Sequence, residues 1–129
     1  MSIHVGLASG RWQLLTLAEQ LGNIGSEISR TINWKQRQNE AYAGRAFDRA
    51  LELFDLTLAD ARWAGRRYEL CRAREVVCDF FAGSNAYHST EKNILTYFDA
   101  FAIQARLEKL ATLSDPELKD PILTGKIKF

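Results

Sequence analysis

Histidine and cysteine, the side chains that most often bind metals or attack substrates, are scarce in this chain of 129 residues. The histidines are His4 and His88, and the cysteines are Cys71 and Cys78, which lack the Cys-x-x-Cys spacing of zinc sites. No glutamate has a histidine three residues after it, the pair that di-metal helical bundles use. His88 stands beside Ser89, but neighbours on a loop rarely adopt the geometry of nucleophilic catalysis. We therefore expect no metal, no cofactor and no enzymatic activity.

Arg74 is the charged residue whose position most suggests a site. It lies between the two cysteines on a helical line that otherwise reads as buried. A guanidinium cannot lose its charge, so burial requires a carboxylate partner, and Asp55 or Glu27 is the natural candidate. We interpret this group as a buried ion pair between helices that fixes their register. The alternative is a polar pocket for an anionic ligand, with Arg74, Asp55, Glu27 and His88 as its candidate binding residues.

Arginines are concentrated in one segment, although the whole chain is almost neutral. The chain has 17 basic and 16 acidic residues, a net charge of +1, so no overall field attracts nucleic acid or an anionic membrane. Between residues 61 and 90 all the basic residues are arginines, and aromatic residues alternate with them. Arginines and aromatics together can hold phosphates and stack on bases. Nearby acidic residues favour local ion pairs instead, and the alternative is a nucleic-acid surface formed by Arg62, Arg66 and Arg67.

The elements that position these side chains are predicted to be four helices. Apolar residues recur at steps of three and four in four segments, which is typical of helices with one buried face. Short connections between the segments favour an all-α, antiparallel up-down four-helix bundle. Residues 1–113 form this domain, and residues 114–129, which contain both prolines, form an irregular tail packed on the bundle or on a partner. The predicted helices run from Ser9 to at least Ile32, from Glu40 to Asp60, from Arg66 to Phe81, and from Ser89 or Thr90 to Leu113.

Two further patterns concern packing. Gly22 and Gly25 make one side of the first helix thin, which favours close approach of another helix; a ligand against exposed backbone is the alternative. Three tryptophans near helix ends lie outside the apolar stripes and could form an exposed patch that an interface covers. These are Trp12, Trp34 and Trp63. The predicted core stripes are Leu14, Leu17, Leu21, Ile24, Ile28 and Ile32 in the first helix and Ile94, Phe98, Phe101, Ala105 and Leu107 in the fourth.

The cysteines and the hydropathy of the chain bear on its compartment. Cys71 and Cys78 are two helical turns apart, a rise of about 10 Å, which a disulfide does not bridge. We expect two reduced thiols that face the core of a cytoplasmic protein. No basic segment followed by an apolar run marks a signal peptide, and no apolar run is long enough to span a membrane.

Three phrases resemble an uncharacterised family of small bacterial helical proteins: residues 25–30 (GSEISR), 45–57 (RAFDRALELFDLT) and 74–81 (REVVCDFF). The resemblance covers roughly residues 20–105 and brings no activity with it. At the level of fold the chain is similar to HEPN-type bundles, which pair with nucleotidyltransferases or act as RNases in toxin–antitoxin systems. Their catalytic signature is an arginine followed four to six residues later by a histidine. The nearest arginine before His88 is Arg74, fourteen residues away, so the resemblance implies no RNase chemistry here.

The function that these observations favour is a non-enzymatic interaction module. We expect it to form a dimer or to bind a small protein partner, without a membrane or a metal. The alternative is a HEPN-like protein that associates with nucleotides or RNA.

Overall fold

Four long helices and two short 3-10 helices make up the described part of the chain, residues 10–114 of a computed structural model. The all-α four-helix bundle predicted above is confirmed. His4, the predicted cap Ser9 and residues 115–129 of the predicted tail lie outside the described residues. None of the helices within residues 10–114 is long and apolar enough to cross a membrane. The elements are η2 (Trp12–Leu14), α1 (Leu17–Gln36), α2 (Glu40–Leu58), η3 (Ala61–Arg66), α3 (Arg67–Ala82) and α4 (Glu91–Ser114).

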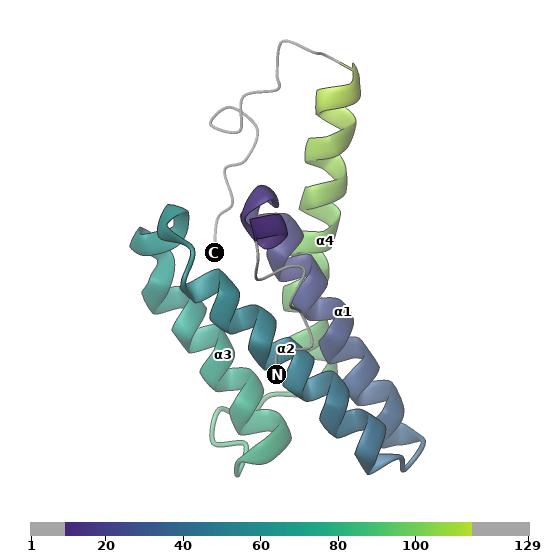
Figure 1. Cartoon of the computed structure of the whole chain (residues 1–129). Helices are drawn as coiled ribbons and strands as arrows, with labels where there is room; N and C mark the ends of the chain where they lie inside the picture. The colour runs from purple at the N-terminus through teal and green to yellow at the C-terminus, as the bar shows by residue number, and fades with distance from the viewer. Residues whose placement is uncertain (1–9, 115–129) are drawn as a thin grey trace.

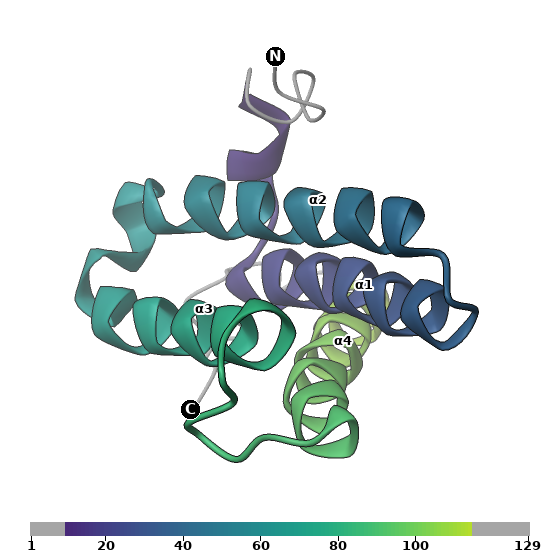
Figure 2. The same cartoon turned by 90° about the horizontal axis from the view of Figure 1, so that it is seen from below.

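Helix α1 is the centre of the bundle. It packs along α2 on one side and against α4 on the other, whereas α3 packs mainly along α2 (Figures 1 and 2). Successive helices run in opposite directions, as short connections require. Helix α4 crosses α1 steeply, and its C-terminal half extends past the ends of the other helices (Figure 1). The arrangement therefore leaves the C-terminal half of α4 projecting from the bundle.

The predicted core stripe of α1 is confirmed except at its first residue. Leu14 is 81% exposed, and the other predicted positions are buried: Leu17, Leu21, Ile24, Ile28 and Ile32. Leu14 belongs to η2, because the chain turns before α1 begins at Leu17. The predicted start near Ser9 is thus wrong. The actual start is a capping box: Thr16 accepts a hydrogen bond from the Glu19 amide, and the Glu19 carboxylate accepts one from the Thr16 amide.

The two glycines of α1 lie where α4 crosses it. An ideal Cβ on Gly25 would lie 2.6 Å from Cβ of Phe98, and one on Gly22 would lie 3.3 Å from Cα of Ala102. Real Cβ atoms do not approach another carbon as closely as 2.6 Å. The glycines therefore serve close helix packing, which confirms the first of the two interpretations.

Helix α3 is more exposed than its sequence pattern suggests. Within the helix only Leu70 and Val77 are buried. Cys71 is exposed and Cys78 is half-buried, both as free thiols. The prediction that both cysteines face the core is wrong, because α3 sits at the edge of the bundle and contacts α2 along a narrow line.

Candidate functional site

The predicted partner of Arg74 is correct, but the burial of the pair is not. Nε of Arg74 donates a hydrogen bond to Oδ1 of Asp55 at 3.1 Å. The Asp55 side chain is 62% exposed and that of Arg74 is 33% exposed. This pair joins α2 to α3 at the surface, because the edge position of α3 leaves its charged residues in contact with water. Exposed pairs of this kind contribute about 0–1 kcal/mol to stability.

Glu27 and His88 are not part of the Arg74 pair. The buried carboxylate of Glu27 accepts a hydrogen bond from Nε of Arg49 at 2.9 Å and is also paired with Arg30. Glu27 therefore joins α1 to α2 instead. His88 lies in the exposed loop before α4, with a φ of 53°. The pocket predicted from Arg74, Asp55, Glu27 and His88 does not form as one site.

The arginines proposed to bind nucleic acid already have acceptors within the chain. Arg62 binds Asp60 through Nε and Nη2, at 3.1 and 2.7 Å, and also donates to the Leu15 carbonyl at 2.7 Å. Arg67 donates to the Leu58 carbonyl at the end of α2, at 3.2 Å.

Arg66 is also engaged. It pairs with Glu69 at 3.5 Å, across one turn at the start of α3. Arg62, Arg66 and Arg67 thus share a local role: they close helix ends and form short-range ion pairs. This supports the interpretation of the cluster as local ion pairs.

A buried polar cluster that the sequence analysis missed lies where η2, α1, α2 and η3 meet. Its centre is Gln20, whose Nε2 donates to the Trp12 carbonyl at 3.0 Å and to Oδ2 of Asp60 at 3.2 Å. Oε1 of Gln20 accepts a hydrogen bond from Nε1 of Trp63 at 2.9 Å. Nε1 of Trp12 donates to the hydroxyl of Thr57 at 3.1 Å. Because these buried groups satisfy one another, we assign the cluster a structural role.

The electrostatics of Asp60 fit that role. Its carboxylate is almost completely buried and accepts hydrogen bonds from the side chain and amide of Arg62 and from Gln20. The hydrogen bond from the Arg62 guanidinium is the largest cause that holds the pKa of Asp60 below its ordinary value, although burial opposes it.

The tryptophans do not form the predicted exposed patch. Trp12 is buried in the core, and the Trp63 indole is held by Gln20. Trp34 is half-buried and packs edge-on against Tyr42 with ring centroids 4.8 Å apart. This prediction is wrong because an indole placed at a helix end can turn inward when its N–H finds an acceptor.

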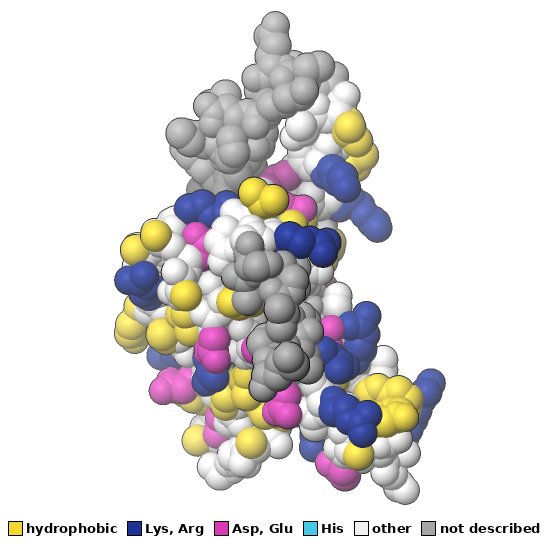
Figure 3. Space-filling view, in the orientation of Figure 1, with side chains coloured by type: hydrophobic (Ala, Val, Ile, Leu, Met, Phe, Trp, Pro, Cys, Tyr) yellow, Lys and Arg dark blue, Asp and Glu magenta, His cyan; other side chains and the backbone are white. Residues whose placement is uncertain are grey.

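A row of exposed aliphatic residues lies on the projecting half of α4 instead. Four aliphatic side chains there are 54–73% exposed, and Figure 3 shows apolar side chains at this end of the molecule beside basic ones. With 3.6 residues per turn, Ile103, Leu107 and Leu110 fall on the side of α4 opposite its buried residues Ile94, Phe98 and Phe101, and Leu113 lies about a quarter of a turn from that side near the end of the helix. Leu107, predicted to belong to the core stripe, is therefore outside it. We call this set the α4 stripe: Ile103, Leu107, Leu110 and Leu113.

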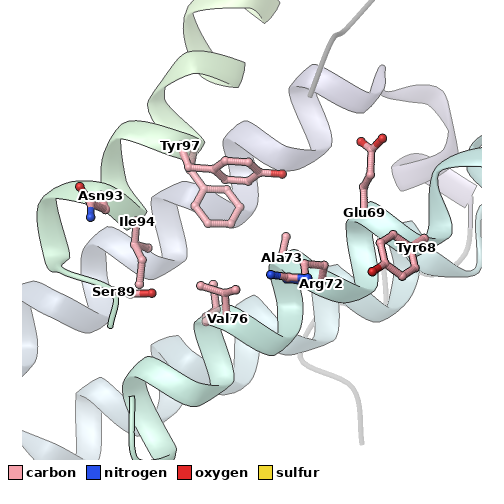
Figure 4. Close-up of a pocket in the computed structure, with 11 residues that line it drawn as sticks. Tyr68, Glu69, Arg72, Ala73, Val76, Ser89, Asn93, Ile94 and Tyr97 are labelled. Atoms are coloured by element: carbon pink, nitrogen blue, oxygen red, sulfur yellow. The ribbon is translucent and has the colours of Figure 1, made fainter. Parts of the chain in front are cut away.

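A hollow of about 370 Å³ lies between α3 and α4 (Figure 4). Its wall is almost entirely apolar, and polar side chains stand at its margin. No group of three or more metal-binding side chains occurs among residues 10–114. Because its wall is apolar, the hollow can hold the apolar part of a ligand. Its lining residues are Tyr68, Glu69, Arg72, Ala73, Val76, Val77, Ser89, Asn93, Ile94, Tyr97 and Phe98.

Comparison with known proteins returned no matching family model, no matching curated sequence and no matching solved structure. The resemblance to small bacterial helical proteins and to HEPN-type bundles stays a prediction. So does the RNA-associated alternative.

Proposed function

We propose that this protein is a non-enzymatic interaction module that forms a dimer through the α4 stripe. The observation that carries the proposal is that α4 is apolar on two opposite sides. One side packs on α1, and the other presents aliphatic side chains to solvent beyond the end of the bundle. A row of exposed aliphatic side chains on one side of a helix is typical of an interaction surface, so the second side calls for a partner.

A second copy of the chain is the partner we favour. Two-fold pairing buries the same stripe on both subunits, and symmetric dimers are the commonest oligomers. The stripe extends over about three helical turns, roughly 16 Å. Because this contact is small, the dimer should be weak, with a dissociation constant in the micromolar range or above.

The free thiols bear on where the module acts. Cys71 and Cys78 are both unpaired, and one of them is exposed. Exposed free thiols suit a reducing compartment, and we therefore propose a cytoplasmic location.

The test is sedimentation velocity of the full chain, from about 1 µM to 1 mM. We expect the sedimentation coefficient to rise with concentration, and Leu107→Glu to weaken dimerisation at least tenfold. Burial of one leucine contributes about 1.5–3 kcal/mol, and each dimer would lose two such leucines and bury two carboxylates.

Thr96→Glu is the matched control. It places the same carboxylate at an exposed position on the same side of the same helix, about three turns before Leu107 and about two turns before the α4 stripe begins. It should dimerise like the wild type. A wild-type chain that stays monomeric throughout, or a Leu107→Glu chain that dimerises normally, would contradict the proposal.

A further inference from the structure

We propose that the hollow between α3 and α4 binds a small amphipathic carboxylate, with its apolar body in the hollow and its carboxylate on Arg72. The hollow has the character of ligand sites, which are mostly apolar with a few placed polar groups and have volumes of about 300–1,000 Å³. This inference is independent of the α4 stripe, which lies on the projecting half of the same helix.

The apolar part of the site comes from short side chains on α3 that face larger ones on α4. Ala73 and Val76 leave space in front of Ile94, and the ring of Tyr97 lies across the gap (Figure 4). Phe98 also lines the hollow. A water molecule occupies about 30 Å³ in the liquid, so a hollow of about 370 Å³ accommodates roughly a dozen non-hydrogen atoms. A saturated chain of about ten carbons with a carboxylate has this size.

Arg72 decides the charge of the ligand. Figure 4 shows its guanidinium directed into the gap from α3 and the Ser89 hydroxyl directed into it from the opposite side. The guanidinium stacks on the ring of Tyr87 at 5.0 Å, and no carboxylate within residues 10–114 forms an ion pair with it. Glu69, the acidic residue at the margin, already pairs with Arg66. A planar guanidinium that is held by stacking and keeps its N–H groups available matches a carboxylate.

Besides the hydroxyls of Tyr68 and Tyr97, the lining adds the neutral side chains of Ser89 and Asn93 and no second cation. Ser89 and Asn93 supply a hydroxyl and an amide where α4 begins, close to the positive end of its helix dipole. Both groups can hydrogen-bond a carboxylate oxygen. The site therefore combines one cation, Arg72, with neutral polar groups, while the Glu69 carboxylate is paired with Arg66, and this set suits a single negative charge.

The experiment is isothermal titration calorimetry of decanoate, below its micelle concentration, into the full chain. The Leu107→Glu background keeps the protein monomeric if the proposed dimer exists, so the two proposals are tested separately. We expect one decanoate per chain and binding of decanol at least tenfold weaker, because decanol has the same body without the charge. Arg72→Gln should weaken decanoate binding at least tenfold while decanol binding stays the same.

Arg45→Gln is the matched control for Arg72→Gln. Arg45 also stacks on a tyrosine, at 4.9 Å from the ring of Tyr42, but it lies on α2 away from the hollow. Arg45→Gln should bind decanoate like the wild type. A second variant, Ala73→Leu, fills the hollow without touching Arg72 and should abolish binding of decanoate and decanol alike.

Three outcomes would overturn the proposal. One is the absence of saturable decanoate binding to the wild type. Another is equal affinity for decanol and decanoate, which would mean a purely apolar groove. The third is equal weakening by Arg72→Gln and Arg45→Gln, which would mean a general effect of positive charge.

Discussion

At the scale of single residues, burial and hydrogen bonds show which polar side chains stabilise the fold and which remain exposed to solvent. Asp60 and Asp55 both pair with an arginine, but Asp60 is buried and accepts four hydrogen bonds, whereas Asp55 is mostly exposed. The pair between Arg74 and Asp55 could be predicted from sequence, because helical spacing places the two residues on facing sides. The central role of Gln20 could not, because a glutamine next to apolar residues carries no signal of burial.

We expect Asp60→Asn to lower the free energy of unfolding by about 1–2 kcal/mol, measured by urea denaturation at neutral pH. The amide keeps the shape of the side chain but loses the charge that Arg62 binds at 2.7 Å. Asp55→Asn is the control and should change stability by less than about 1 kcal/mol, because its pair is exposed to water. Equal effects of the two substitutions would contradict the structural role of the Gln20 cluster.

The stability contributed by Asp60 should also depend on pH. Its pKa is lowered in the folded state, so the folded state binds this proton less readily than the unfolded state does. The contribution is therefore present above the ordinary pKa of 3.8 and is lost as the pH falls through the lower folded value. Urea denaturation between about pH 6 and pH 3 should show a shallower loss of stability for Asp60→Asn than for the wild type. Parallel pH profiles would show that Asp60 is not the titrating group.

At the scale of elements, the existence and type of the four long helices followed from apolar periodicity, but the first boundary did not. A run of apolar residues continues backward from Leu17 through Leu14, and periodicity alone cannot stop it. The capping box of Thr16 and Glu19 does stop it, because the side chains bond the free amides of the first turn. Local hydrogen bonding thus overrides the apolar pattern at this helix end.

Helix α4 shows a second limit of periodicity. Apolar periodicity predicts a single core face for this helix, although Leu107 falls on the side opposite Phe98 and Phe101. A helix with two apolar sides has no single stripe, so the sequence cannot tell which side meets the bundle. The contact with the glycines of α1 determines which side of α4 meets the bundle. Gly25 leaves room for Phe98, and any larger residue at position 25 would overlap the Phe98 side chain.

The crossing of α1 and α4 gives a test at this scale. Gly25→Ala should destabilise the fold by about 1–3 kcal/mol in thermal or urea unfolding, because the added methyl group would overlap Cβ of Phe98. Gly44→Ala is the control: it lies inside α2, and nothing would contact the added methyl group. It should stabilise the protein by up to about 1 kcal/mol through helix propensity. Stabilisation by both substitutions would mean that the two helices do not cross this closely.

At the scale of the whole molecule, positive and negative charges nearly cancel. Much of this cancellation is local, because arginines pair with nearby carboxylates. The arginines at the start of α3 close helix ends or pair with nearby carboxylates, while the projecting half of α4 has exposed aliphatic residues. Composition alone could predict the lack of a strong overall field. It could not predict that the apolar surface lies on α4 and not on the tryptophans, because that depends on which side of each helix the bundle covers.

This distribution predicts how association should respond to salt. Apolar contacts between exposed helices are insensitive to screening, so raising NaCl from about 0.05 to 0.5 M should change the dimer dissociation constant by less than about threefold. Sodium sulfate should strengthen the dimer, because it favours burial of apolar surface. Sedimentation equilibrium in the two salts measures both effects. A dimer that dissociates as NaCl rises would be held by ion pairs and would contradict a role for the α4 stripe.

The same salt series distinguishes the RNA-associated alternative. Binding through Arg62, Arg66 and Arg67 would release counterions, so the affinity for a labelled single-stranded RNA would fall steeply as salt rises. We expect no RNA binding at about 0.05 M NaCl, because these guanidiniums already hold Asp60, Glu69 and the carbonyls of Leu15 and Leu58. Fluorescence anisotropy measures it, with the double variant Arg66→Glu/Arg67→Glu as the comparison. Salt-sensitive binding that this variant abolishes would favour the nucleic-acid function, since loss of fold is checked separately by circular dichroism.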